Sequence, residues 1–240
     1  MAEEDSPGTA VIVGVGPGLG AALVRAFAAE GYTVIGAARR ASGLAGFERE
    51  RDEGRVVLED CDATELADVE RLFAGAALPA RGPLRAAVFN AGAFVRSGVL
   101  DTDPAEFERC WRIGCFGGFL VGRAAALQML PHGTGTIILT GATASLRGGP
   151  GFVNLAAPKF GLRAVAQSMA RELGPRGIHV AHAIIDGQIR SARYAHLNEE
   201  RGPDALLEPD AIAAAYLHLH RQHRSAWTHE LDLRPWVEKF

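Results

Sequence analysis

The chain has 240 residues, of which 48% are hydrophobic and 22% are charged, and its formal net charge is −3. These fractions exclude collagen-like, coiled-coil and disordered chains, and a chain of this length buries about 70–75% of its unfolded surface without a disulfide or a metal. The pI is near 6.2. The sequence has no basic footprint of the kind that binds nucleic acid or an anionic membrane, so neither is expected as a partner.

The chain starts with an acidic stretch, Met1-Ala2-Glu3-Glu4-Asp5, where a secretory signal would be basic. We find no apolar run approaching the ~20 residues of a membrane span. Cys61, Cys110 and Cys115 are odd in number and lack the spacing of a zinc site, so no metal is expected. We interpret them as buried thiols in a reducing compartment, which predicts a cytoplasmic protein.

Apolar segments of strand length alternate with longer helical patterns along the chain. A strand is predicted at Thr9–Gly14 and a helix at Leu19–Glu30, where LGAALVRAFAAE is strongly apolar. Two further strands follow at Thr33–Ala38 and Arg55–Asp60, and a helix is predicted from about Thr64 to Gly75.

A fourth strand, Leu84–Asn90, precedes a long helix that opens at Asp103-Pro104-Ala105-Glu106. Asp103 is placed to cap this helix, Pro104 suits its first position, and Glu106 has the spacing of a capping box. Glycines at positions 114, 117, 118 and 122 predict close packing of this helix against another. The remaining predicted elements are the strand Thr136–Thr140, the helix Phe152–Leu173, the strand His179–Ile185, the helix Pro209–His220 and the short strand Glu230–Leu233.

This alternation predicts a single α/β domain over residues 1–240, doubly wound, with a seven-stranded and mostly parallel sheet covered by helices on both faces. The most polar region, Arg190–Glu208, contains glycine, proline and several charges. We interpret residues 190–208 as a mobile loop or a lid over the substrate.

A glycine-rich turn, Gly14-Val15-Gly16-Pro17-Gly18-Leu19-Gly20, joins the first strand to the first helix. Backbone N–H groups in such a turn approach a pyrophosphate closely, and the helix N-terminus adds its positive dipole end. The other interpretation is a tight turn without a ligand. Four glycines in seven residues reduce stability, which favours a dinucleotide site at Gly14, Gly16, Gly18, Leu19 and Gly20.

The spacing Gly14-x-x-x-Gly18-x-Gly20 resembles that of the short-chain dehydrogenase/reductase family, and further motifs extend the resemblance over nearly the whole chain. The matching segments are Cys61-Asp62-Ala63, Asn90-Ala91-Gly92, Leu146–Pro150, Lys159-Phe160-Gly161 and Asp186-Gly187-Gln188-Ile189. The resemblance implies a Rossmann-type fold and oxidoreductase activity. It also implies that Asp62 contacts adenine, and that Ala63, Asn90, Ala91, Gly92, Lys159, Gly187 and Ile189 contact the cofactor.

The end of the second strand indicates which cofactor is bound. In this fold an acid at that point binds the adenosine ribose of NAD, but here the segment reads Gly36-Ala37-Ala38-Arg39-Arg40. Ala38 takes the position of the acid. An arginine binds a 2′-phosphate that an acid would repel, so we predict NADP bound through Arg39. The alternative is that both arginines are simply solvated.

The resembled family uses a tyrosine four residues before a lysine, a serine thirteen residues before the tyrosine, and an asparagine in the preceding long helix. Counting back from Lys159, the tyrosine position is Leu155, the serine position is Ala142, and Gly114 takes the place of the asparagine. Only the lysine of the four remains. Losing a general acid typically costs 10²–10⁴-fold in rate, so ordinary ketone reduction by the family mechanism should be very slow.

Other groups are candidates to replace the missing acid. Thr140 and Thr143 flank Ala142 and carry hydroxyls, and Tyr194 follows the cofactor loop where a lid would fold over substrate. The candidate catalytic residues are therefore Lys159 and Tyr194. Two functions stay open: an NADP-dependent oxidoreductase of unknown small-molecule substrate, and a cofactor-binding pseudoenzyme that acts as a sensor, scaffold or oligomer partner. The family resemblance also implies a homo-oligomer, either a dimer or a tetramer.

Overall fold

The computed structural model describes residues 7–194 and 196–238. Its centre is a sheet of seven strands, and every neighbouring pair of these strands is parallel. The strands are β1 (Thr9–Val13), β2 (Thr33–Ala38), β3 (Val56–Asp60), β4 (Leu84–Phe89), β5 (Gly135–Thr140), β6 (Ile178–Ile185) and β7 (Glu230–Leu233), in the order β3-β2-β1-β4-β5-β6-β7. The predicted doubly wound α/β fold is confirmed, with a sheet that is entirely rather than mostly parallel.

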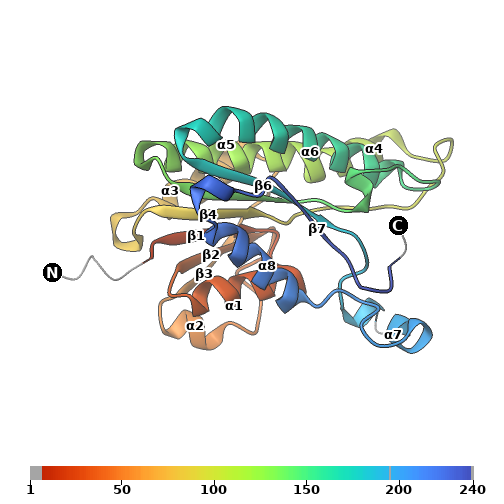
Figure 1. Ribbon diagram of the computed structural model, residues 1–240, viewed down its shortest axis with the longest axis horizontal. Helices are drawn as coiled ribbons and strands as arrows, with labels where there is room; N and C mark the ends of the chain where they lie inside the picture. Colours follow the sequence, from red (N-terminus) through yellow and green to blue (C-terminus); the bar gives the residue numbers. More distant parts are fainter. Residues whose placement is uncertain (1–6, 195, 239–240) are drawn as a thin grey trace.

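Helices cover both faces of the sheet (Figure 1). On one face lie α3 (Leu66–Ala76), α4 (Pro104–Trp111), α5 (Gly117–Met129) and α6 (Val153–Leu173), and on the other lie α1 (Leu19–Ala29), α2 (Glu48–Asp52) and α8 (Pro209–Arg221). A short helix, α7 (His196–Arg201), lies apart from these layers. The sequence prediction missed α2 and α7, because both are short and neither has an apolar period.

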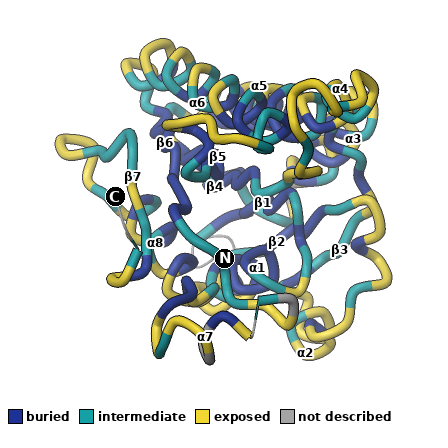
Figure 2. Tube along the Cα trace, turned by 90° about the vertical axis from the view of Figure 1, so that its right-hand side faces the viewer, coloured by how far each residue is buried: buried dark blue, intermediate teal, exposed yellow. Residues whose placement is uncertain are grey.

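The strands form two cores because successive side chains point to opposite faces. In β1, Val11 and Val13 belong to the core under α3, α5 and α6, whereas Ala10 and Ile12 belong to the core under α1 and α8. Figure 2 shows the five central strands β2, β1, β4, β5 and β6 as buried along most of their length, whereas the edge strands β3 and β7 are mostly intermediate. The three cysteines are free and buried, as predicted.

The long helical run after β4 differs in detail from the prediction. The Asp103 carboxylate does cap it, accepting the Ala105 N–H at 3.0 Å. Glu106 does not complete a capping box, because its two oxygens accept hydrogen bonds from Arg109, each at 2.9 Å. A π-turn at Arg112–Phe116 separates α4 from α5. Such turns arise where one residue is inserted into an α-helix.

Glycines let this helical run approach α6, as predicted. A Cβ built on Gly118 would lie 2.3 Å from Leu162 Cδ1, and one on Gly122 would lie 2.8 Å from Met169 Cε. The whole run Pro104–His132 is long and apolar enough to cross a membrane by length and composition, which the sequence analysis overlooked. In the structure 61% of its most apolar window is buried, and α5 packs against β4, β5 and α6, as a core helix does.

Residues 190–208, predicted as a loop or lid, contain a short 3-10 turn at Ala192–Tyr194 and the helix α7, and residue 195 lies outside the described part. A parallel bridge between Ile189 and Leu207 closes the base of this segment. Its function as a lid stays a prediction.

Candidate functional site

The site begins where the winding of the sheet reverses, between β1 and β4. Both strands end at the same edge, and the loops that follow them diverge to leave a crevice. The Asn90 amide Nδ2 donates to the Gly14 carbonyl at 3.1 Å, and the Asn90 N–H donates to Val13 O at 2.7 Å. The residue after β4 therefore holds the glycine-rich turn after β1 in place.

The glycines of this turn have different structural functions. Gly14 has a φ of +98°, and a Cβ on it would lie 2.4 Å from the Ala91 nitrogen, so only glycine fits. A Cβ on Gly20 would lie 2.6 Å from Gly14 O, which lets α1 pack closely on the turn. Gly16 and Gly18 face open space, and no side chain caps α1 at Gly18. The backbone is thus left open toward a ligand at the amino end of this helix.

A cleft of about 270 Å³ lies beside the turn. It brings together many of the predicted cofactor residues, namely Gly14, Gly16, Arg39, Asp62, Ala63, Asn90, Ala91 and Gly92. Its other lining residues are Val13, Val15, Ala38, Cys61, Thr64 and Ile113. Of the remaining predicted residues, Gly18, Leu19, Gly20, Lys159, Gly187 and Ile189 do not line this cleft.

Arg39 links this cleft to a second one of about 310 Å³. Arg109 and Arg112 also line the second cleft, and sequence analysis missed both as site residues. Arg109 is paired with Glu106, and Arg112 donates to Thr64 O at 3.2 Å. Within the described part of the chain, no carboxylate lies within ion-pair distance of Arg39, and Arg40 lines neither cleft.

Lys159 lies on α6 and is buried. Its ammonium Nζ donates to Thr140 O at 2.6 Å and lies 4.0 Å from where a Cβ on Gly92 would be, so it reaches the edge of the cleft. Burial disfavours the charged form and lowers the pKa of Lys159 to about 8. The group still carries its proton at neutral pH.

The positions around Lys159 lack the family's polar groups, as counted from the sequence. Leu155 lies one turn before Lys159 on α6, and Ala142 follows β5. Gly114 lies in the π-turn, where a Cβ would be only 3.0 Å from the Pro158 Cβ. The proline occupies the space that a larger side chain at residue 114 would need.

The threonines are poor replacements for the missing acid. The Thr140 hydroxyl bonds the Tyr216 hydroxyl at 3.0 Å in the core, and burial raises the pKa of that tyrosine. The Thr143 hydroxyl donates a hydrogen bond to the Asp186 carboxylate. Asp186 also pairs with Arg234 at 3.5 Å, so it joins the ends of β5 and β6 to the segment after β7.

The other predicted residues lie near these strand ends. Gly187 has a φ of +149°, and a Cβ on it would meet Pro235 Cδ at 2.9 Å. Ile189 forms the bridge with Leu207. Tyr194 is half-buried in the Ala192–Tyr194 turn, and its N–H donates to Ser191 O at 3.0 Å.

A buried polar chain lies behind Ala142. Ser145 Oγ accepts the Ala142 N–H at 3.1 Å and lies 3.4 Å from His182 Nε2, and His182 Nδ1 is 3.7 Å from Glu230 Oε1. Burial lowers the pKa of His182 to about 4, so the ring is neutral. Ser145 is fully buried. These three side chains support the loop that carries Ala142 and do not form a nucleophilic site.

Comparisons with known proteins agree with this fold. The sequence model of the family described as "short chain dehydrogenase" matches residues 8–202. The chain therefore belongs to the short-chain dehydrogenase/reductase family. A short-chain dehydrogenase/reductase of Armillaria gallica is 30% identical over 216 residues, covering 87% of this chain and 81% of that protein.

Two solved structures are similar along nearly the whole chain. A short-chain dehydrogenase from Rhodopseudomonas palustris is 43% identical, with a TM-score of 0.81, and the match covers 95% of this chain and 98% of that one. A metagenomic short-chain oxidoreductase, solved in complex with NADP, is 26% identical with a TM-score of 0.80, covering 97% and 99% of the two chains.

The burial of Lys159 predicts a pH-dependent contribution to stability. Below pH 8 both folded and unfolded chains hold the proton, and the full cost of burying a charge is present. Between pH 8 and the ordinary value of 10.5 the folded chain releases the proton first, so this cost disappears as the pH rises. The free energy of unfolding of wild type relative to Lys159→Met should therefore increase by about 2 kcal/mol between pH 7.5 and 10.

Urea unfolding of both proteins at the two pH values measures this difference. Lys159→Met is the internal control for every other group that titrates in the range. A constant difference between the two proteins would contradict the lowered pKa.

Proposed function

We propose that this protein is an NADP(H)-dependent oxidoreductase whose active site departs from the acid–base chemistry of its family. The observation that supports this proposal is the cleft beside the glycine turn, which ends near Lys159 and contains Arg39 with Ala38 in place of an acid. A related oxidoreductase of the same fold binds NADP.

The residues present fit a phosphorylated dinucleotide. The open backbone at Gly16 and Gly18 suits a pyrophosphate at the amino end of α1. Arg39 is exposed at the end of β2, where its guanidinium is placed to bind a 2′-phosphate. The Asp62 carboxylate accepts hydrogen bonds from the Thr64 N–H at 2.9 Å and the Thr64 hydroxyl at 2.8 Å. These bonds orient the carboxylate at the proposed adenine end of the cleft.

NADPH, when bound, supplies a hydride. Reduction of a ketone also needs a proton at oxygen, and neither Leu155 nor Ala142 donates one. An iminium substrate needs no such proton, because it carries the charge already and becomes a neutral amine on accepting hydride. A carbonyl substrate requires another acid, for which Tyr194 stays the candidate. Lys159 holds its proton at neutral pH and is assigned to the cofactor ribose.

The second candidate function is a cofactor-binding pseudoenzyme. The packing of Pro158 against Gly114 favours it, because the space of the family's asparagine is filled rather than merely vacated. Both functions are compatible with the predicted homo-oligomer. Exposed apolar side chains on α4, α5 and α6 support a self-association surface, and these are Trp111, Phe119, Leu127 and Phe160.

The cofactor assignment predicts a change of preference in Arg39→Asp. The wild type should bind NADPH and NADP more tightly than NADH and NAD, and the variant should lose about 10–100-fold in affinity for the phosphorylated pair, because a carboxylate repels the 2′-phosphate. Nicotinamide fluorescence and melting temperature measure binding of all four. Arg40→Gln is the matched control and should bind as wild type. Equal wild-type affinity for both pairs would overturn the assignment.

The proposed acid is tested by Tyr194→Phe. If Tyr194 donates the proton, turnover of carbonyl substrates in a screen of ketones, imines and enones should fall about 10²-fold or more, while NADPH affinity stays constant. Reduction of a preformed iminium ion should be unaffected, because it becomes a neutral amine on accepting hydride and needs no proton from the protein. Unchanged ketone reduction in the variant would eliminate Tyr194.

Restoring the family's residues tests whether the site is otherwise competent. Ala142→Ser with Leu155→Tyr should raise ketone reduction about 10²-fold or more. Introducing Gly114→Asn into this double variant should lower the urea midpoint, because the new side chain collides with Pro158. A further Pro158→Ser change should remove the collision and restore the midpoint. NADPH oxidation and unfolding are the readouts. If no variant that still binds NADPH reduces ketones, the result would favour the pseudoenzyme.

A further inference from the structure

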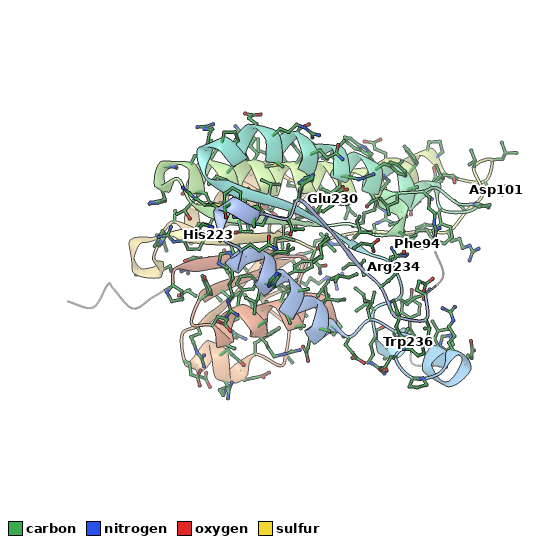
Figure 3. All side chains as sticks on the ribbon, in the orientation of Figure 1. Phe94, Asp101, His223, Glu230, Arg234 and Trp236 are labelled. Carbon is green, nitrogen blue, oxygen red and sulfur yellow. The ribbon has the colours of Figure 1, made fainter. Side chains whose placement is uncertain are left out.

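A third cavity, of about 500 Å³, lies at the opposite edge of the sheet from the nucleotide cleft. Arg85 enters it from the beginning of β4 and Thr136 from the beginning of β5, whereas the cleft is formed by residues that follow strand ends. Figure 3 shows His223, another lining residue, at the opposite end of the molecule from Phe94 and Arg234. The lining residues are Pro7, Tyr32, Arg85, Thr134, Gly135, Thr136, His220, Arg221, Gln222, His223, Arg224 and Trp227.

The cavity is strongly cationic. Arg85, Arg221 and Arg224 line it, and none of the lining residues is a carboxylate. Arg221 is paired with Glu30, which lies outside the lining. Within the described residues, Arg85 and Arg224 have no carboxylate at ion-pair distance. Two guanidinium groups are thus available to an anion, and a third is shared.

A hydrogen-bonded chain forms the floor of the cavity. The Tyr32 hydroxyl bonds His220 Nε2 at 2.8 Å, and His220 Nδ1 bonds the buried Thr136 hydroxyl at 3.0 Å. Burial, and then the charges of His179 and Arg85, lower the pKa of His220 to about 4. The histidine is therefore neutral, and the arginines supply the positive charge. Edge-to-face contact of Tyr32 with His220 keeps this floor rigid.

Trp227 gives the cavity an aromatic wall. Its indole N–H donates to Gln222 O at 3.2 Å, and its ring stacks on His179 with centroids 4.9 Å apart and an interplanar angle of 2°. The side chain is half-buried, so part of the indole stays exposed. A flat ring fixed beside exposed guanidinium groups is suited to a ligand that is aromatic at one end and anionic at the other.

We propose that this cavity is a binding site for a small aromatic phosphate monoester, with the phosphate held by Arg85 and Arg224 and the ring against Trp227. Guanidinium groups bind phosphate oxygens through paired hydrogen bonds, and the arginines are the charged groups that line this cavity. The site shares no residue with the nucleotide cleft and does not depend on the proposed oxidoreductase activity.

Titration with phenyl phosphate tests the proposal. Binding should change the fluorescence of Trp227, and this change should be absent in Trp227→Phe. Arg85→Gln and Arg224→Gln should each weaken binding at least about tenfold, whereas Arg123→Gln, an exposed arginine on α5, should leave it unchanged. Melting temperatures confirm that the variants are folded. Equal loss in the Arg123 control, or no loss in either cavity variant, would overturn the site.

A gain of affinity gives a sharper test. Glu30→Gln releases Arg221 from its ion pair, so the variant should bind phenyl phosphate several-fold more tightly than wild type. Inorganic phosphate is the second probe. It should bind more weakly than phenyl phosphate, because it makes no contact with Trp227, and equal affinities would contradict the aromatic part of the proposal.

The chain's own acidic stretch is the competing occupant. Glu3, Glu4 and Asp5 shortly precede Pro7, which lines the cavity. A variant with Glu3→Gln, Glu4→Gln and Asp5→Asn should bind phenyl phosphate like wild type. Binding by this variant alone would assign the cavity to that stretch and overturn the proposal, as would the absence of binding in both proteins.

Discussion

The contact between the ends of β1 and β4 is the constraint on which the rest of the structure depends. Gly14 must approach the Ala91 backbone without a Cβ, and the Asn90 amide then holds the Gly14 carbonyl. This contact sets the point at which the winding of the sheet reverses. The cleft exists because β2 and β3 extend to one side of it and β5 and β6 to the other. Arg39 and Lys159 reach the same crevice from these two sides.

The strands and the glycine turn could be predicted from the sequence because their signals are local. Buried parallel strands read as continuous apolar runs, and the turn is a short motif between a strand and a helix. Asp62 and Asn90 could be assigned to the cofactor through the family resemblance, and Arg39 through its position at the end of the second strand. Helix α2, with the sequence ERERD, carries no apolar period and could not be predicted.

The parts that could not be predicted depend on contacts between distant segments. No local pattern shows that the Thr140 hydroxyl faces Tyr216, or that Asp186 joins Thr143 to Arg234. The same holds for the cavity at the opposite edge of the sheet, whose arginines come from β4, from the end of α8 and from the turn after it. The sequence shows these residues as ordinary surface charges, and only the fold brings them to one place.

The burial of Lys159 bears on whether this position serves a ligand or only the fold. Placing an ammonium group in the core has a free-energy cost, which its single hydrogen bond to Thr140 O offsets only in part. An apolar side chain of similar length would fill the same space between α6 and β5 without that cost. If the chain had kept only its fold, this position would therefore favour a methionine or leucine, as Leu155 shows one turn earlier. A charged group beside Gly92, at the edge of the cleft, therefore supports the proposal that a ligand binds there.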